Sequence, residues 1–259
     1  MNQEDYDKIK ASFESYVSKF ISESEEILSN IDLKHKHSLR TAETIKDLAK
    51  EIELSNSDLL LVQAAALLHD IGRFEQLIKY GTFSDTDQIN HIDLGISAIQ
   101  ENHILANLNE EEKEIIIECI RFHHLPEIPK SINEKALPFV QLVRDSDRID
   151  AMFVAADYYS CNKSGTNRRL EMELADKPEI SKKLYQQIMK EKVVSNKEIL
   201  TLNDLKLQQM SWVFDLNFKK SFQIVSEKTL LKQIYETLPK KDLVIDMYRQ
   251  MKIYLENQL

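Results

Sequence analysis

Apolar residues recur every three or four positions through most of the chain, which is the spacing of one face of an α-helix. The pattern predicts helices over residues 4–30, 35–52, 57–70, 90–101, 110–124 and 134–158, followed by three or four amphipathic helices before Leu259. Residues 79–90 are predicted to form a polar loop, and residues 160–167 a linker or exposed loop. The fold class that follows is all-α.

The segment 57–70 differs from the other predicted helices because it is apolar on nearly every side. We therefore expect it to be the central buried helix. Ser57 and Asp58 are capping residue types at its start, and Gly72 lies where a helix of this length would end. Pro126 and Pro129 are expected to stop the helix at 110–124, since proline lacks the N–H that a helix needs.

Composition excludes several classes of protein. The 259 residues include 4 glycines and 5 prolines, too few for the turns of an all-β fold, and no glycine-rich phosphate loop occurs. The two cysteines, Cys119 and Cys161, cannot form a cysteine-based zinc site and favour a reducing cytoplasm. The net charge of −9 argues against general binding to nucleic acid or to an anionic membrane. We therefore expect a cytoplasmic protein with no membrane segment.

All seven histidines lie between residues 35 and 124. On a helical wheel, four of them, from four predicted helices, point toward the core: His37, His69, His91 and His123. A single buried histidine is more often hydrogen-bonded in the core, but a shared metal ion satisfies several imidazoles at once. Four inward-facing histidines together favour a metal site. His35 and His103 are expected at the surface, and His124 is open between a ligand, a substrate contact and a supporting group.

Three aspartates are candidate partners of these histidines. Asp70 directly follows His69, and a carboxylate after so apolar a run needs a metal or a strong cationic partner. Both side chains can reach one ion only near a helix end. Further along the chain, the wheel places Asp145 on the apolar face and Asp147 nearer its edge. The wheel alone favours Asp145.

These residues together resemble a known family. His37, the run ALLHDIGR at 66–73 and a downstream aspartate are similar to the H…HD…D pattern of the HD superfamily of metal-dependent phosphohydrolases, over about residues 33–155. The resemblance implies an HD-domain helical bundle with a divalent metal held by His37, His69, Asp70 and that aspartate. In the family the last aspartate usually precedes a basic–hydrophobic pair, which ranks Asp147 before Asp145.

His91 and the pair His123-His124 resemble the additional ligands of HD branches that hold two metals, among them cyclic-dinucleotide phosphodiesterases and dinucleoside tetraphosphate hydrolases. The resemblance implies two ions of Mn, Fe, Mg, Ni or Zn, with His91 and His123 on the second, Asp70 bridging and His124 an alternative. Some HD enzymes use one ion, in which case His91 and His123 contact substrate. The Gly-Tyr-Pro segment of one cyclic-dinucleotide branch is missing after His124.

The function implied by the resemblance is hydrolysis of a nucleotide, or a related phosphate ester or anhydride, through a metal-activated water. Asp70 and His69 would carry the catalysis, and Arg73 is the best candidate to contact phosphate, ahead of Arg40 and Arg148. Two alternatives stay open: a metal- and nucleotide-binding regulatory HD module without turnover, and a helical interaction protein with incidental histidines.

Three regions are predicted along the chain. Residues 1–32 are expected to form an N-terminal helix that packs on the core, and residues 33–160 the HD phosphohydrolase domain. Residues 161–259 are expected to be a helical extension that acts as a cap or an oligomerisation surface, which allows a homodimer.

Overall fold

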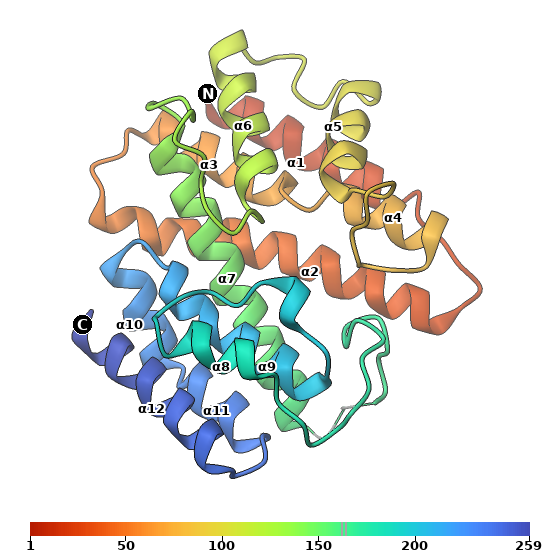
Figure 1. The fold of residues 1–259 in the computed structure, drawn as a ribbon. Coiled ribbons are helices and arrows are strands. Elements are labelled where there is room, and N and C mark those ends of the chain that lie inside the picture. The colour runs from red at the N-terminus through yellow and green to blue at the C-terminus, as the bar shows by residue number, and fades with distance from the viewer. Residues whose placement is uncertain (162, 164) are drawn as a thin grey trace. The chain divides into compact units, whose positions relative to one another are not determined.

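The chain is built from helices (Figure 1). The computed structural model describes residues 1–161, 163 and 165–259, and no strand occurs among them. These residues form two compact units, Met1–Asp147 and Arg148–Leu259, and the division falls inside one helix, α7 (Leu137–Ser160). The predicted all-α fold is confirmed. The three predicted regions, with boundaries at 32 and 160, stay a prediction.

In the first unit, the other helices surround one buried helix, α3 (Asn56–Leu68). Its residues 60–68 are no more than 5% exposed, as expected for a segment that is apolar on every side. Helices α1, α2 and α6 pack against it, and α5 packs against α4 and α6. Figure 1 shows these helices in colours from red to green. Their bounds are α1 Gln3–Val17, α2 Glu25–Leu48, α4 Gly72–Tyr80, α5 His91–Glu101 and α6 Glu110–Phe122.

The prediction of one helix over 4–30 is wrong. Helix α1 ends at Val17, and α2 begins at Glu25 after the non-helical segment 18–24. The Ser24 side chain accepts a hydrogen bond from the Ile27 N–H, and acidic residues fill the first turn of α2. Both features favour a helix start, because the first N–H groups need acceptors and carry positive partial charge. Helix α2 therefore begins ten residues before the predicted start at 35 and runs continuously to Leu48.

Gly72 does not end the buried helix as predicted. Helix α3 ends at Leu68, and Gly72 is the first residue of α4, a helix that the sequence pattern did not reveal. A Cβ atom at Gly72 would lie 2.0 Å from the backbone oxygen of His91 and 2.5 Å from the backbone nitrogen of Gly95. Glycine is therefore needed here for the close approach of α4 and α5, and not for a turn.

The second unit contains the C-terminal part of α7 and five further α-helices among the described residues, where three or four were predicted. Several are shorter than ten residues, so each holds too few apolar positions for a clear periodic signal. Helix α9 lies at the centre, with every residue buried. The predicted linker at 160–167 includes residues 162 and 164, which lie outside the described residues. The bounds are α8 Lys182–Ile188, α9 Leu202–Ser211, α10 Lys219–Glu227, α11 Leu230–Glu236 and α12 Asp242–Asn257.

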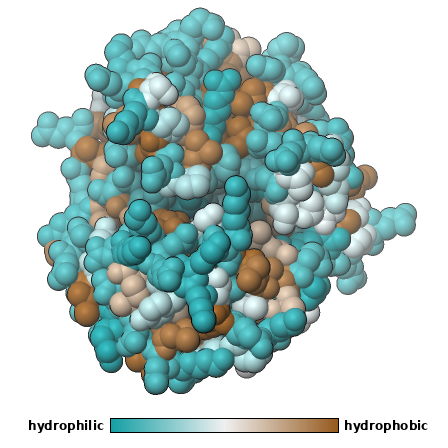
Figure 2. Space-filling view, in the orientation of Figure 1, coloured by the Kyte–Doolittle hydropathy of each residue, from teal (hydrophilic) through white to brown (hydrophobic). Residues whose placement is uncertain are grey.

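Hydrophilic residues cover most of the face shown in Figure 2, and hydrophobic residues appear there in small separate areas. The most exposed large apolar side chains are Ile21, at 81%, and Leu200, at 68%. Among the described residues, none of the helices combines the length and the hydrophobicity needed to cross a membrane.

Candidate metal centre

The ends of several helices in the first unit bring imidazoles and carboxylates together. His37 projects from the middle of α2. His69 follows the last residue of α3, His91 is the first residue of α5, and His123 follows the last residue of α6. The remaining contributors are Asp70, His124 and Asp147, the last of these on α7. All of them belong to the first unit.

One set of ligand atoms, which we call the first group, comprises His37, His69, Asp147 and the Oδ2 atom of Asp70. The Nε2 atoms of His37 and His69 lie 3.2 Å apart. Asp147 Oδ1 lies 3.3 Å from His37 Nε2 and 3.6 Å from His69 Nε2. Asp70 Oδ2 lies 3.7 Å from both nitrogens. Four atoms from three segments of the chain, α2, the end of α3 and α7, therefore face one point inside the unit.

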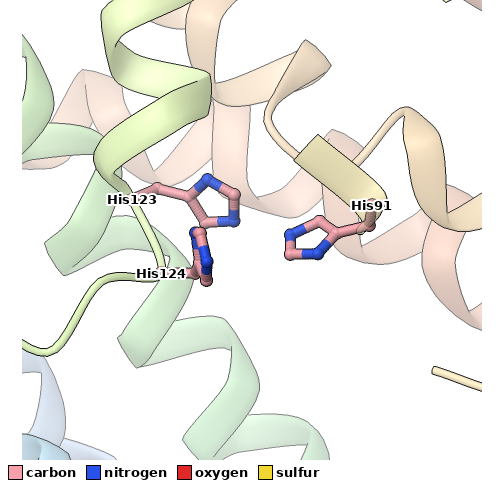
Figure 3. Close-up of side chains that lie close together, drawn as sticks. All are labelled: His91, His123 and His124. Atoms are coloured by element: carbon pink, nitrogen blue, oxygen red, sulfur yellow. The ribbon is translucent and has the colours of Figure 1, made fainter. Parts of the chain in front are cut away.

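The second group comprises His91, His123, His124 and the Oδ1 atom of Asp70. The three imidazoles point toward one another from the start of α5 and the end of α6 (Figure 3). Each offers a nitrogen within 4.8 Å of the other two. Asp70 Oδ1 lies 3.6 Å from His91 Nε2 and 3.7 Å from His123 Nε2. Asp70 thus directs one oxygen at each group.

Both groups fit divalent cations. Nitrogen and oxygen ligands about 2.1 Å from one ion lie roughly 3.0 to 3.4 Å apart in octahedral or tetrahedral arrangements. The first group, at 3.2 to 3.7 Å, is close to that spacing without an ion. In the second group, His91 Nε2 and His124 Nδ1 are buried atoms without a hydrogen-bond partner. A buried nitrogen without a partner is costly, and a cation would satisfy it.

Hydrogen bonds to the far side of three rings orient them toward the centre. His69 Nδ1 donates to the Ala66 carbonyl over 2.7 Å, and His123 Nδ1 to the Ile120 carbonyl over 2.8 Å. His91 Nδ1 donates to Asp85 Oδ2 over 2.6 Å. Because each Nδ1 carries the proton, the neutral ring presents the lone pair of Nε2 to the centre.

The protonation states also suit cation binding. Burial raises the pKa of Asp70, but the positive charge of Lys34, together with the neighbouring His69, His123 and Arg73, outweighs it and holds that pKa well below its usual range. Burial likewise opposes ionisation of Asp147, yet hydrogen bonding to His37 and His69 lowers its pKa. Burial lowers the pKa of the second-group imidazoles, to about 3 for His91 and about 4 for His124. Near pH 7 the carboxylates are therefore charged and those imidazoles neutral, as metal ligands must be.

Arg73, the predicted phosphate contact, forms hydrogen bonds within the first unit, mainly with the loop that follows α4. Its Nη1 atom lies 2.6 Å from the Phe83 carbonyl, 2.8 Å from Gln76 Oε1 and 3.2 Å from Asp85 Oδ1. Its Nε atom lies 3.4 Å from Asp70 Oδ1. These contacts join the loop after α4 to the centre, and contact with phosphate stays a prediction.

The other sequence candidates lie apart from the cluster. Asp145 is fully buried, but it belongs to none of the candidate ligand groups found among the described residues. His35 pairs with Glu14 at 2.8 Å and stacks on Phe13, so it is only partly exposed. His103 is exposed in the turn after α5, with a positive φ of 51°. The structure thus brings Asp147, and not Asp145, beside His37 and His69.

Three residues near the centre were missed by sequence reasoning. Lys34 Nζ lies 2.7 Å from Asp70 Oδ2, and Asp85 accepts the proton of His91 Nδ1. Arg144 is 1% exposed and donates to the Phe122 and Leu125 carbonyls, which fixes the chain on both sides of the His123-His124 pair. Only Lys34 had a local signal, because it lies one helical turn before His37.

A comparison with protein families agrees with this geometry. Residues 35–152 match the family model described as HD domain. The chain contains an HD domain. The match supports membership of residues 35–152 in the HD-domain superfamily, which implies metal-dependent phosphohydrolase chemistry. Neither the comparison with curated proteins nor that with solved structures gave a match. The cluster described above lies inside the matched segment.

Proposed function

We propose that this HD domain hydrolyses a phosphate ester or anhydride, most simply in a nucleotide, with two divalent cations. The observation that carries the proposal is the position of Asp70, whose two oxygens face two separate sets of imidazoles. A carboxylate in that position can bridge two ions about 3.5 to 4 Å apart, the spacing of two-metal phosphoryl-transfer sites.

The residues divide between the two ions in a simple way. His37, His69, Asp147 and Asp70 Oδ2 would hold one, and His91, His123, Asp70 Oδ1 and the neighbouring His124 the other. Mixed imidazole and carboxylate ligands suit Mn, Fe, Ni or Zn better than Mg. Such cations lower the pKa of bound water and offset the charge of a phosphoryl group.

The chain's own groups prepare the centre for that chemistry. Asp70 and Asp147 supply two buried negative charges that attract cations into a protein whose surface is acidic. The neutral imidazoles accept cations without a further charge penalty, and Asp85 keeps His91 in the tautomer that presents Nε2. In an acidic chain, bound cations are therefore the means by which an anionic phosphate is attracted.

The test is metal analysis combined with a hydrolysis screen. Protein prepared without oxygen should contain two transition-metal ions per chain, and it should hydrolyse members of a nucleotide panel. His69→Ala should abolish hydrolysis because it removes a first-group ligand. His103→Asn is the matched control, since His103 is exposed and asparagine tolerates its positive φ. Absence of bound metal would contradict the proposal.

The same experiment distinguishes the regulatory alternative. A module without turnover would bind metal and nucleotides but hydrolyse none of the panel. A nucleotide as the substrate, a homodimer and a cytoplasmic location stay predictions.

A further inference from the structure

A lysine lies at the edge of the candidate metal centre. It contacts Asp70 through the carboxylate oxygen that belongs to the first group. Lys34 Nζ lies 2.7 Å from Asp70 Oδ2, and its side chain is 19% exposed. The ammonium also lies 5.6 Å from the centroid of the Phe83 ring. Lys34 precedes His37 by three residues on α2, so both side chains project from one face of that helix.

Because of this contact, the Lys34 ammonium and a divalent ion in the first group would compete for the same oxygen of Asp70. Asp70 Oδ2 is the oxygen that the first group offers to an ion, and Lys34 already donates to it. A buried carboxylate without a cation nearby is strongly unfavourable, so Lys34 stabilises Asp70 in the metal-free chain. An ion bound by the first group would weaken that contact, because two cations repel at this distance.

Other basic groups near the centre are held by several partners. Arg73 donates hydrogen bonds to Phe83, Gln76 and Asp85. Arg144 is buried and donates hydrogen bonds to backbone carbonyls. Lysine differs from both, because its ammonium sits on a flexible stem and donates three bonds in freely chosen directions. Lys34 can therefore change partner without moving the backbone of α2.

We propose that Lys34 is an exchangeable cation of this centre. It neutralises Asp70 while no divalent ion is bound, and it binds the phosphoryl group of the substrate once an ion takes over the Asp70 oxygen. The second half rests on the proposed hydrolase function, whereas the first half requires only the metal site.

The first half is tested by titrating metal-free protein with Mn²⁺ in a calorimeter. Lys34→Met should bind Mn²⁺ at least about tenfold more tightly than the unchanged chain, since a repelling charge is removed. Its metal-free form should melt at a lower temperature, because Asp70 loses its partner. Lys36→Met is the matched control: Lys36 lies on the exposed side of α2 and pairs with Asp32 at 2.7 Å. It should leave both measurements unchanged.

The second half is tested with inorganic phosphate on the Mn²⁺-loaded protein. Lys34→Met should weaken phosphate binding by about tenfold or more, the effect of losing a charged hydrogen bond. Lys34→Arg should largely restore it, since a guanidinium also binds phosphate. The same variants separate a phosphate contact from a general loss of structure, which arginine would not reverse.

The outcomes separate this proposal from the proposed function. Equal or weaker Mn²⁺ binding by Lys34→Met overturns the first half. Unchanged phosphate binding by Lys34→Met overturns the second. If the unchanged Mn²⁺-loaded protein binds no phosphate, the second half fails together with the hydrolase proposal, while the Mn²⁺ titration still decides the first.

Discussion

The two ligand groups beside Asp70 differ in their chemistry. The first group contains two imidazoles and has Asp147 in addition to Asp70 Oδ2, and its side chains are no more than 12% exposed. The second group contains three imidazoles, its single carboxylate oxygen is Asp70 Oδ1, and His124 is only partly buried. One group is therefore rich in negative charge, whereas the other depends on neutral nitrogen ligands.

This difference indicates how each group would behave. In the first group, charges and hydrogen bonds compensate one another without a metal: the two carboxylates lie beside Lys34, His37 and His69. In the second, His91 Nε2 and His124 Nδ1 are left without partners. We therefore expect the first group to bind its ion more tightly and to form without it, and the second group to respond more to supporting residues.

The largest effect is expected at the residue that both groups share. Asp70→Asn removes the negative charge between them, so both ions should be lost and hydrolysis should fall by about a thousandfold or more. Metal content and turnover measure this together. Asp93→Asn, an exposed aspartate in the first turn of α5, is the control for loss of one charge. Retention of two ions by Asp70→Asn would show that Asp70 does not bridge the groups.

The next effect should fall on the second group alone. A Cβ at Gly72 would overlap the His91 backbone oxygen, so Gly72→Ala should push α5 away from α4 and misplace His91. Overpacking of this kind costs about 1 to 3 kcal/mol. We expect one ion per chain instead of two, together with a lower melting temperature. Thermal unfolding and metal analysis are the measurements.

Gly95→Ala provides a matched comparison for Gly72→Ala. Its Cβ would meet its nearest neighbour at 3.2 Å, a contact that small shifts can relieve. The helix gains up to about 1 kcal/mol when alanine replaces glycine, which offsets part of the strain. Gly95→Ala should therefore keep both ions. Equal behaviour of the two variants would mean that the α4–α5 contact does not position His91.

A smaller effect is expected from Asp85→Asn. This change keeps the shape of the side chain but weakens the hydrogen bond that orients His91. Loss of such a supporting carboxylate typically weakens metal binding by about 10- to 100-fold. In a competition experiment with a chelator, the weaker metal binding should appear only at the second group, which contains His91. Asp87→Asn, in the same loop and exposed, should have no effect, and weakening at both sites would argue against two distinct groups.

The histidine cluster was predictable, and its internal arrangement was not. Helical periodicity places His37 toward the core because α2 is long and the phase of a long helix is well defined. Periodicity reports burial but not the neighbour that a buried side chain meets. The wheel favoured Asp145, but Asp145 and Asp147 are both buried, so burial does not distinguish a ligand from a core residue. The family pattern ranked Asp147 first.

The supporting contacts were hidden for a related reason. Asp85 lies in a loop, where no periodicity predicts the direction of a side chain. Its hydrogen bond with His91 depends on the conformation of that loop. The role of Gly72 depends on the close approach of α5, a contact that no local pattern encodes. The spacing of Lys34 from His37 indicates that the two side chains share a helix face, but the contact of Lys34 with Asp70 is visible only in the structure.

The smallest effect concerns the metal-free chain and the pH. Burial lowers the pKa of His91 to about 3, so this imidazole stays neutral in the folded state well below pH 6.5. The unfolded chain protonates it near pH 6.5 and so binds more protons than the folded chain. Folding stability should therefore fall as the pH drops through 6.5, by roughly 0.8 kcal/mol for His91 at pH 6. Burial also lowers the pKa of His123, which acts in the same direction. Urea unfolding of chelator-treated protein at pH 7.5 and pH 6 measures it. His91→Gln should flatten the profile, since glutamine does not titrate, and an unchanged slope in that variant would show that the second group is not buried as the structure describes.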